Sequence, residues 1–485
     1  MDEWPVPTWA PAFLLYFLEN YEYFCENTVN MKRFLILLLL LFMPLASFAE
    51  RVPLEKARSV ASHFFSLQPA TKASSSLQLV AGGDEIYVFQ RNGGGYVIVS
   101  GEDTAIPVLG YSATGRFDTE SLPANCKAWL DEYKTQIRFL RDNGAGRNSR
   151  AEALWNELLA PTKAGESSFE PQLLLTTASW SQGSPYNELC PVIDSARCIT
   201  GCVATAGAIV AKYYNYPRSC SGTILGYGFE YDGKHYDVPA HEITPEYDWD
   251  HMPMSTSAIT TDREKRAVAE LMYDMGTIAR SMYGLDATSA YTSNLYNGMI
   301  KYLGFDNNAQ YLFRRNYADS VWVDMLKRDL NETGPILYSG SSEDSGHQFL
   351  LTGYDTKDNF YINWGWGGTG NGYYALDAFS YGTHKYLYNH DAVLGMKPSG
   401  YEPQEGDLDE VTTVDFDPAT HTVTLETFRD VSYTFTDSSG QAVTRGVSKE
   451  GRKIIIRSEN YKADTYVLTL TRGGQTKVLE LMLGR

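Results

Sequence analysis

The order of helical and strand patterns between Gln172 and Met396 constrains the fold of this chain more than any other feature of its sequence. Apolar residues recur at helical spacing over Cys202–Tyr214, Arg266–Met282 and Ser320–Leu330. Four short strand-like runs, broken by Gly, Ser and Asp, follow at Pro335–Tyr338, Gln348–Gly353, Phe360–Trp364 and Tyr373–Leu376. Helices that precede strands, rather than alternate with them, predict an α+β fold.

Two further units flank this central region, which we bound at residues 164–398. Amphipathic helical patterns and a hairpin signal around Asn92 predict a small α+β unit over residues 50–163. Apolar residues show no helical or strand spacing between Ala160 and Pro171, which predicts a polar and protease-accessible link. After Pro398, alternating strand patterns separated by Gly-containing turns predict a β-sandwich over residues 399–485.

One apolar run near the start predicts export. Residues Phe34 to Leu45 follow Met31-Lys32-Arg33 and precede Ser47-Phe48-Ala49, the pattern of a secretory signal peptide over residues 31–49. The run is shorter than the roughly 20 residues that a membrane-spanning helix needs. Residues 1–30 lack basic character, and we interpret them as a misassigned start; the alternative is a genuine amphipathic extension. The chain is therefore expected to be secreted or at the cell surface, without stable membrane insertion after signal cleavage.

Charge and cysteine content exclude several classes. The chain has 485 residues, with 41 Lys+Arg against 59 Asp+Glu and a net charge of −18, which argues against a nucleic-acid partner. Six cysteines are too few for a disulfide framework in a chain of this length. Cys190, Cys198 and Cys220 form no CxxC pair and the acidic clusters lack calcium-loop spacing, so we expect no metal and no cofactor. A disulfide among these three cysteines stays open.

Cys202 is the strongest candidate for a reactive group. It follows Thr200-Gly201 at the head of an apolar helix that ends before Pro217. Unpaired N–H groups and the helix dipole stabilise a thiolate at such a position, so a lowered pKa is expected, and the same N–H groups could bind an oxyanion. The alternative is a small buried cysteine that packs as a hydrophobic residue.

Three other polar residues stand in the order expected around a nucleophilic cysteine. His347 begins an apolar strand far downstream of Cys202, as in papain-type enzymes. Asn363 opens the next strand, where its amide could orient the imidazole. Upstream, Gln182 could donate a side-chain N–H to an oxyanion. Taken singly, they could be a strand histidine, a turn residue and a loop amide.

Several sequence motifs resemble those of the streptopain family of secreted bacterial cysteine peptidases. They are Trp180-Ser-Gln182-Gly-Ser-Pro-Tyr-Asn187, Thr200-Gly-Cys-Val-Ala-Thr-Ala206, Tyr213-Tyr-Asn-Tyr-Pro217, Gly346-His347 and Asn363-Trp-Gly-Trp-Gly-Gly368. The resemblance spans about residues 50–396 and implies a papain-like catalytic domain behind an inhibitory prodomain.

The resemblance also implies roles for individual residues. Cys202 would be the nucleophile, His347 the proton acceptor and Gln182 an oxyanion donor. Ser289 and Gly346 would line the substrate cleft. Asn363 and Trp364 both match the third catalytic position, and we include Trp364 and Trp366 among the expected substrate-binding residues.

The resulting hypothesis is a secreted, self-processing cysteine endopeptidase zymogen. Its expected partners are protein or peptide substrates and its own prodomain. Two other classes remain open: a catalytically silent surface protein that binds peptides or glycans, and a thiol amidase or transglutaminase that uses the same residues. Peptide products, isopeptide bonds or no reaction would distinguish the three.

Overall fold

A computed structural model describes most of the chain from residue 50 onward. The described residues are 50–67, 76–144, 149–160, 169–341, 346–378, 389–400, 412–417, 422–427, 431–438, 442–448, 452–457, 464–472 and 475–483. The predicted signal peptide, the upstream extension and residues 161–168 of the link lie outside these ranges. Within them, no helix has the length and apolar character needed to cross a lipid bilayer.

The region before the link contains helices and a β-meander. Its elements are α4 (Leu54–Leu67), β1 (Leu77–Gly82), β2 (Ile86–Arg91), β3 (Tyr96–Ser100), β4 (Val108–Ser112), α5 (Ala124–Asp142) and α6 (Ser149–Leu159). The predicted hairpin is confirmed, since β2 pairs antiparallel with β3 around Asn92. The apolar stripe of α4 is buried, with Phe64 1% and Phe65 9% exposed. The predicted α+β character of this unit is therefore correct.

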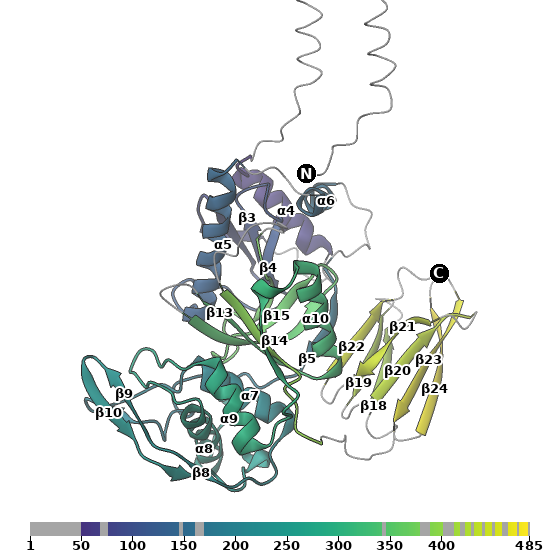
Figure 1. Ribbon diagram of the computed structural model, residues 1–485. Helices are drawn as coiled ribbons and strands as arrows, with labels where there is room; N and C mark the ends of the chain where they lie inside the picture. The colour runs from purple at the N-terminus through teal and green to yellow at the C-terminus, as the bar shows by residue number, and fades with distance from the viewer. Residues whose placement is uncertain are drawn as a thin grey trace, which may run out of the picture. The chain divides into compact units, whose positions relative to one another are not determined.

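The first half of the central region is mainly helical. Its elements are β5 (Pro171–Leu175), β6 (Val192–Ile193), β7 (Ala196–Arg197), α7 (Cys202–Tyr214), β8 (Thr223–Ile224), β9 (Tyr227–Tyr231), β10 (Lys234–Val238), β11 (His241–Glu242), α8 (Asp262–Ile278) and α9 (Thr292–Leu303). Figure 1 shows α7, α8 and α9 gathered together. Residues on all sides of α7 are buried, so this helix forms the centre of a core that α8 and α9 complete.

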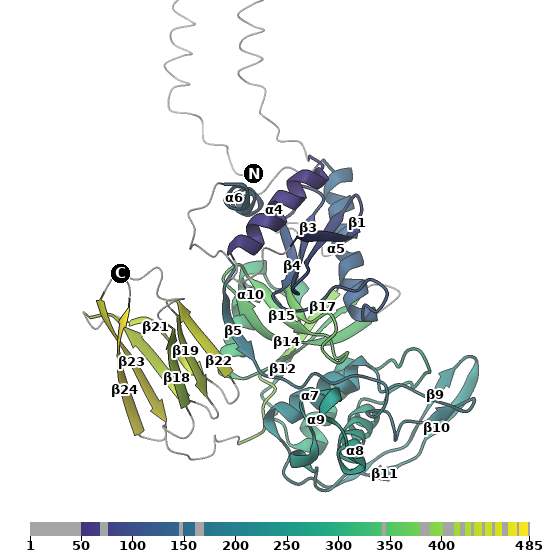
Figure 2. The same cartoon turned by 180° about the vertical axis from the view of Figure 1, so that it is seen from behind.

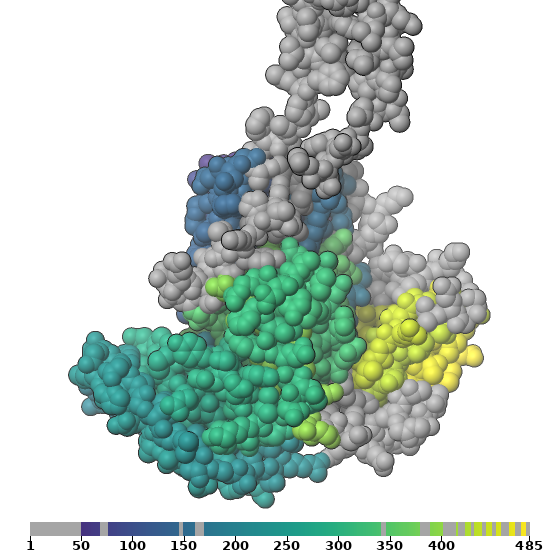
Figure 3. Space-filling view, in the orientation of Figure 1, coloured from purple at the N-terminus to yellow at the C-terminus, as the bar shows by residue number. Residues whose placement is uncertain are grey.

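The second half consists of a sheet and one further α-helix, α10. Its elements are β12 (Gln310–Phe313), α10 (Asp319–Glu332), β13 (Ile336–Ser341), β14 (Gly346–Asp355), β15 (Asn359–Asn363), β16 (Gly372–Ala375) and β17 (Asn389–Leu394). Strands β13 to β16 correspond to the four predicted runs, and β17 pairs with both β12 and β13. Helix α10 lies in front of this sheet (Figure 1). In the space-filling view from the same side, the green part of the chain covers the sheet (Figure 3).

The sheet continues into the region before the link. Strand β4 pairs with β16 through Tyr111 opposite Tyr373 and Gly110 opposite Tyr374, giving the order β1-β2-β3-β4-β16-β15-β14-β5. The view from behind shows β1, β3 and β4 with β14 and β15 (Figure 2). Buried residues of both regions also belong to one hydrophobic cluster. The predicted link between Ala160 and Pro171 interrupts the periodic sequence pattern, but the regions before and after it share one hydrophobic cluster.

The elements described after residue 411 are all strands. They are β18 (Thr412–Asp417), β19 (Thr422–Thr427), β20 (Val431–Thr436), β21 (Ala442–Ser448), β22 (Arg452–Arg457), β23 (Asp464–Arg472) and β24 (Gln475–Leu483). Strands β18, β19 and β22 pair in that order, while β21, β20, β23 and β24 form a separate antiparallel sheet. Strand β22 also pairs with β5 at Arg452 and Lys453.

Candidate active site

Cys202 occupies the first position of α7. Its neighbour Gly201 caps the helix with φ 85°, a conformation that favours glycine, and without a side-chain hydrogen bond. A Cβ atom on Gly201 would lie 2.8 Å from the carbonyl oxygen of Thr288. The glycine therefore allows the loop that contains Thr288 to approach the start of α7 closely. It also leaves the first N–H groups of the helix without a side-chain cap.

The thiol of Cys202 experiences two opposing effects. Burial raises its pKa, while N–H groups of Gln348, Cys202 and Val203 act in the other direction. The Gln348 N–H donates to Sγ over 3.4 Å. Burial outweighs the donors, so the pKa lies above the ordinary value, and the prediction of a lowered pKa is wrong for this structure. The sequence revealed the helix terminus but not how deeply the thiol would be covered.

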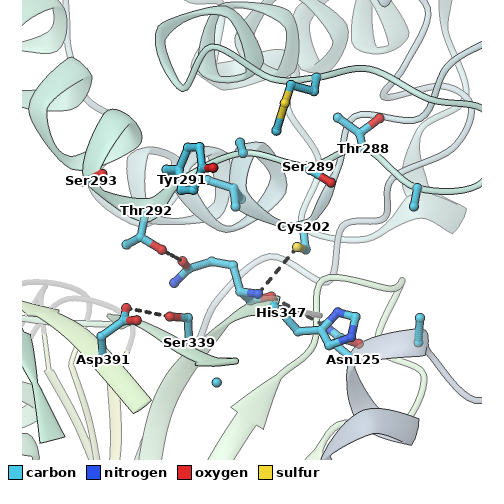
Figure 4. Close-up of a pocket in the computed structure, with 18 of the residues that line it drawn as sticks. Asn125, Cys202, Thr288, Ser289, Tyr291, Thr292, Ser293, Ser339, His347 and Asp391 are labelled. Atoms are coloured by element: carbon cyan, nitrogen blue, oxygen red, sulfur yellow. Dashed lines mark hydrogen bonds between the residues drawn. The ribbon is translucent and has the colours of Figure 1, made fainter. Parts of the chain in front are cut away.

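His347 lies near the start of β14 and lines the same cleft as Cys202. Burial lowers the pKa of its imidazole. Figure 4 shows its ring beside Asn125 and displaced from the Cys202 sulfur. No hydrogen bond from another described residue reaches either ring nitrogen. The two residues thus share one cleft without being hydrogen-bonded to each other.

Four other predicted residues also line this cleft, which has a volume of about 770 Å³: Gln182, Ser289, Gly346 and Trp366. Gln182 is only 3% exposed, and its backbone carbonyl accepts a hydrogen bond from Thr200. Its side-chain amide has no hydrogen-bond partner among the described residues. Ser289 is held at the cleft by two backbone hydrogen bonds with Met282.

Asn363 does not line the cleft. Its amide nitrogen donates to the Thr177 hydroxyl over 3.0 Å and to the Ala178 carbonyl over 2.9 Å. Its side-chain Oδ1 accepts from the Gly365 N–H over 3.1 Å. These contacts fix the strand end against the segment that leads to Gln182, and within the described ranges no hydrogen bond joins Asn363 to His347.

Trp364 is also outside the cleft. It is fully buried, its indole N–H donates to the Gly370 carbonyl over 3.0 Å, and its ring centroid lies 4.8 Å from that of Phe349. A substrate could not reach this ring without displacing the core, so the expected substrate contact of Trp364 does not fit its position. Trp366, two residues further along, lines the cleft and is only partly buried.

Several cleft residues were not predicted from the sequence. They include Asn125, Thr292, Ser339, Gln348 and Asp391. Asn125 comes from α5, and its amide donates to the carbonyl of Trp364 over 2.7 Å and of Gln348 over 3.5 Å. The others come from α9, β13, β14 and β17, and only the pairing of these elements brings them together. Gln348 adjoins the predicted His347, which was the one available local signal.

The described residues contain neither a cluster of metal-ligating side chains nor a disulfide. Among them, no group of three or more His, Cys, Asp or Glu side chains could hold a metal ion. Cys126, Cys190, Cys198, Cys202 and Cys220 are all free thiols. The possible disulfide among Cys190, Cys198 and Cys220 is therefore not formed in this structure.

Two family models match the chain in the regions just described. The peptidase C10 family matches residues 180–374, and the Spi protease inhibitor matches residues 49–137. Streptopain of Streptococcus pyogenes is 28% identical over 342 residues, covering 65% of this chain and 81% of that protein. The thiol protease/hemagglutinin PrtT of Porphyromonas gingivalis is 27% identical over 389 residues, covering 75% of this chain and 44% of that protein.

A solved structure shows the same relationship. A fragment of Prevotella intermedia prointerpain A, carrying a cysteine-to-alanine mutation, is 30% identical, with a TM-score of 0.56. The match covers 67% of this chain and 100% of the fragment. The chain belongs to the peptidase C10 family, the streptopain family of cysteine peptidases, and carries the prodomain of a zymogen.

Proposed function

We propose that Cys202, His347 and Gln182 carry out the peptide-bond hydrolysis of this cysteine peptidase. The observation that supports the assignment most directly is that all three line one cleft at the start of α7. Cys202 contributes the sulfur, His347 a titratable ring and Gln182 an amide that is free to donate. No other thiol among the described residues lines this cleft.

The mechanism follows from these groups. Cys202 passes its proton to His347, and the thiolate forms a bond to the substrate carbonyl carbon while the C–O π electrons move to oxygen. The Cys202 N–H and the Gln182 amide donate to this oxyanion. His347 returns the proton to the leaving amine as the C–N bond breaks and a thioester remains. Water then attacks the thioester with His347 as base, which releases the acid and restores the thiol.

Asn363 is better suited to positioning than to contact with the substrate. Its three hydrogen bonds tie β15 to Thr177, Ala178 and Gly365. Because Thr177 and Ala178 precede Trp180 and Gln182, these bonds support a role in holding the oxyanion-donor segment. The predicted orientation of the His347 ring by Asn363 would require a rearrangement when the prodomain leaves.

The prodomain is proposed to block the cleft through the start of α5. Ala124 and Asn125 line the cleft, and the Asn125 amide donates to the carbonyl of Gln348, next to His347 on β14, and to that of Trp364, which follows β15. The displaced imidazole beside Asn125 supports the same proposal (Figure 4). A zymogen in which the ring is held away from the sulfur has no proton acceptor at hand for the thiol.

The domain limits and the export route are part of this proposal. We assign the prodomain to residues 50–163, the catalytic domain to 164–398 and a β-sandwich to 399–485. The shared apolar cluster of Val423, Leu425, Phe435 and Leu468, drawn from both groups of C-terminal strands, supports a sandwich. The basic and apolar pattern of residues 31–49 supports secretion through a signal peptide.

Cleavage of a denatured protein tests the nucleophile. The full chain is expected to release peptides in the presence of a reducing agent and to stop after thiol alkylation. Cys202→Ala should abolish both this activity and self-maturation. Cys220→Ala is the matched control, because the Cys220 thiol is half-buried outside the cleft and donates to the Thr244 carbonyl. Isopeptide products would favour acyl transfer to amines, and retained activity in Cys202→Ala would reject the assignment.

A further inference from the structure

One end of the cleft contains a carboxylate that the mechanism does not use. Asp391 lines the cleft, is 7% exposed and lies on β17 opposite Ser339 of β13. The Ser339 hydroxyl donates to its Oδ1 over 2.5 Å. Side chains alternate along a strand, so the preceding His390 points to the opposite face, where its ring stacks on Trp129 of α5. Asp391 is thus turned toward the substrate side of the sheet.

Asp391 forms no ion pair with a described residue; burial raises its pKa, while the Ser339 and Tyr311 hydroxyls and the charges of His390 and Arg315 act in the other direction. No cation in the described part of the chain comes within ion-pairing distance of its carboxylate. Two hydroxyl groups face it: that of Ser339 donates to it, and that of Tyr311 has a pKa raised by burial and, after burial, by the Asp391 carboxylate. Burying a charged carboxylate without a cationic partner raises the free energy of the folded protein, and binding of a cationic substrate group would offset this penalty.

We propose that Asp391 forms the floor of a specificity subsite that takes a cationic side chain, lysine or arginine, from the substrate. Ser339, Tyr311 and Thr292 form its polar walls. The inference rests on the proposed roles of Cys202 and His347, because they define the position of the scissile bond.

The position of the subsite assigns it to the acyl side of that bond. His347 protonates the leaving amine, so the leaving group lies on the imidazole side of Cys202. Figure 4 shows Thr292, Ser339 and Asp391 on the other side of Cys202 from the His347 ring. The wall between them is continuous, since the Gln348 N–H donates to the Cys202 sulfur and the Thr292 hydroxyl donates to the Gln348 side chain over 2.5 Å. In an extended substrate successive side chains point to opposite faces, so those that face this wall recur about every 6.6 Å.

Arg315, which lines the same part of the cleft, carries a charge that competes with a cationic substrate side chain. It is exposed, its guanidinium lies 4.6 Å from the Phe313 ring, and it donates to the Asn389 side chain over 3.3 Å. Solvent screens an exposed charge more strongly than a buried one, so the field of Asp391 dominates inside the subsite. Removing the arginine should therefore strengthen the cationic preference.

Fluorogenic peptides test the subsite in the enzyme matured from the full chain. The three residues before the scissile bond are varied one at a time between lysine, glutamine and norleucine, and kcat/KM is measured for each. At one of the three positions the wild-type enzyme should prefer lysine over norleucine by about tenfold, the range expected for a desolvated charge pair. Asp391→Asn should bring the ratio of kcat/KM for the lysine and norleucine peptides close to one. Arg315→Gln should increase the preference.

Asp286→Asn is the matched control, since it removes an exposed carboxylate from the same cleft and should leave the lysine-to-norleucine ratio unchanged. A wild-type enzyme that shows no lysine preference at any of the three positions overturns the proposal, whether or not the Asp391 variant folds. Equal cleavage of glutamine and lysine peptides would also overturn it, because charge would not be recognised. Thiol-dependent cleavage of the norleucine peptides in either case would leave the peptidase assignment standing.

Discussion

At the scale of single residues, burial disfavours the charged forms of both Cys202 and His347. Burial raises the pKa of the thiol and lowers that of the imidazole, so both shifts disfavour the thiolate–imidazolium pair. The three N–H groups directed at the sulfur reduce this penalty without removing it. In the zymogen, these pKa shifts disfavour the reactive thiolate, and this effect adds to the proposed blocking of the cleft by the prodomain.

This state predicts the pH dependence of thiol alkylation. A His347→Ala variant, which should not mature, is treated with iodoacetamide at several pH values, and the peptide that contains Cys202 is quantified by mass spectrometry. Because the thiol pKa is raised, alkylation at pH 7 should be slower than for a free cysteine and should increase only in the alkaline range. Rapid alkylation at pH 7 would show that the thiol is already activated in the zymogen.

Gln182 offers a test of the oxyanion site. If its amide donates to the developing negative charge, Gln182→Ala should lower kcat by about 100-fold with little change in KM. Gln182→Glu should be slower still, because a carboxylate repels both the oxyanion and the thiolate. Steady-state kinetics on the matured enzyme provide the measurement. Wild-type turnover in the Glu variant would mean that Gln182 does not face the reacting carbonyl, and the Trp366 indole would become the next candidate.

The cleft residues that could be predicted from the sequence are those that lie within short, recognisable motifs. Cys202, His347 and Gln182 were recognisable because helix start, strand start and neighbouring glycines occur beside them. Trp364 was misjudged because adjacent residues on one strand end can point into the core or into the cleft, and a single sequence does not distinguish them. Asp391 carries no such local mark, since its environment is supplied by β12 and β13, which are distant in the chain.

At the scale of elements, α5 docks on the catalytic region through one face. Asn125, Trp129, Glu132 and Gln136 recur at helical spacing. Trp129 stacks on His390 with centroids 5.1 Å apart, and the His390 Nε2 lies 3.2 Å from the Glu132 carboxylate. The Gln136 side chain accepts from the Ala378 N–H over 2.8 Å. The sequence predicted this helix from its apolar residues, but the polar positions that contact the catalytic region show no periodicity beyond that of any amphipathic helix.

The start of α5 should control the rate of maturation. Asn125→Ala removes a buried donor and leaves the Trp364 carbonyl without this partner, a loss of about 1–3 kcal/mol. The lag before self-processing should shorten, as followed by gel electrophoresis of the full chain. Asn143→Ala is the control, because that amide donates only to the Phe139 carbonyl at the exposed end of the same helix. An equal lag in both variants would remove Asn125 from the inhibitory contact.

At the scale of the whole molecule, prodomain and catalytic region share a sheet and a hydrophobic cluster. The pairing of β4 with β16 joins residues that lie far apart in the sequence, and nothing in either strand's pattern specifies its partner. The predicted boundary near residue 163 was based on a change in local composition. Local composition marks a connecting segment of the chain, but it does not show which regions pack against each other. Cutting the link should therefore not by itself separate the two parts.

This arrangement predicts that release of the prodomain requires more than cleavage. In a Cys202→Ala chain with a specific protease site inserted after Lys163, the cut fragments should remain together in size-exclusion chromatography. Gly110→Ala should promote their separation, since a Cβ atom there would lie 2.7 Å from the Tyr374 ring and 3.1 Å from the Tyr373 carbonyl. Gly93→Ala, in a turn where the added atom meets nothing within 4 Å, should behave like the parent. If the parent fragments separate at once, the shared sheet does not hold the prodomain, and cleavage alone releases the enzyme.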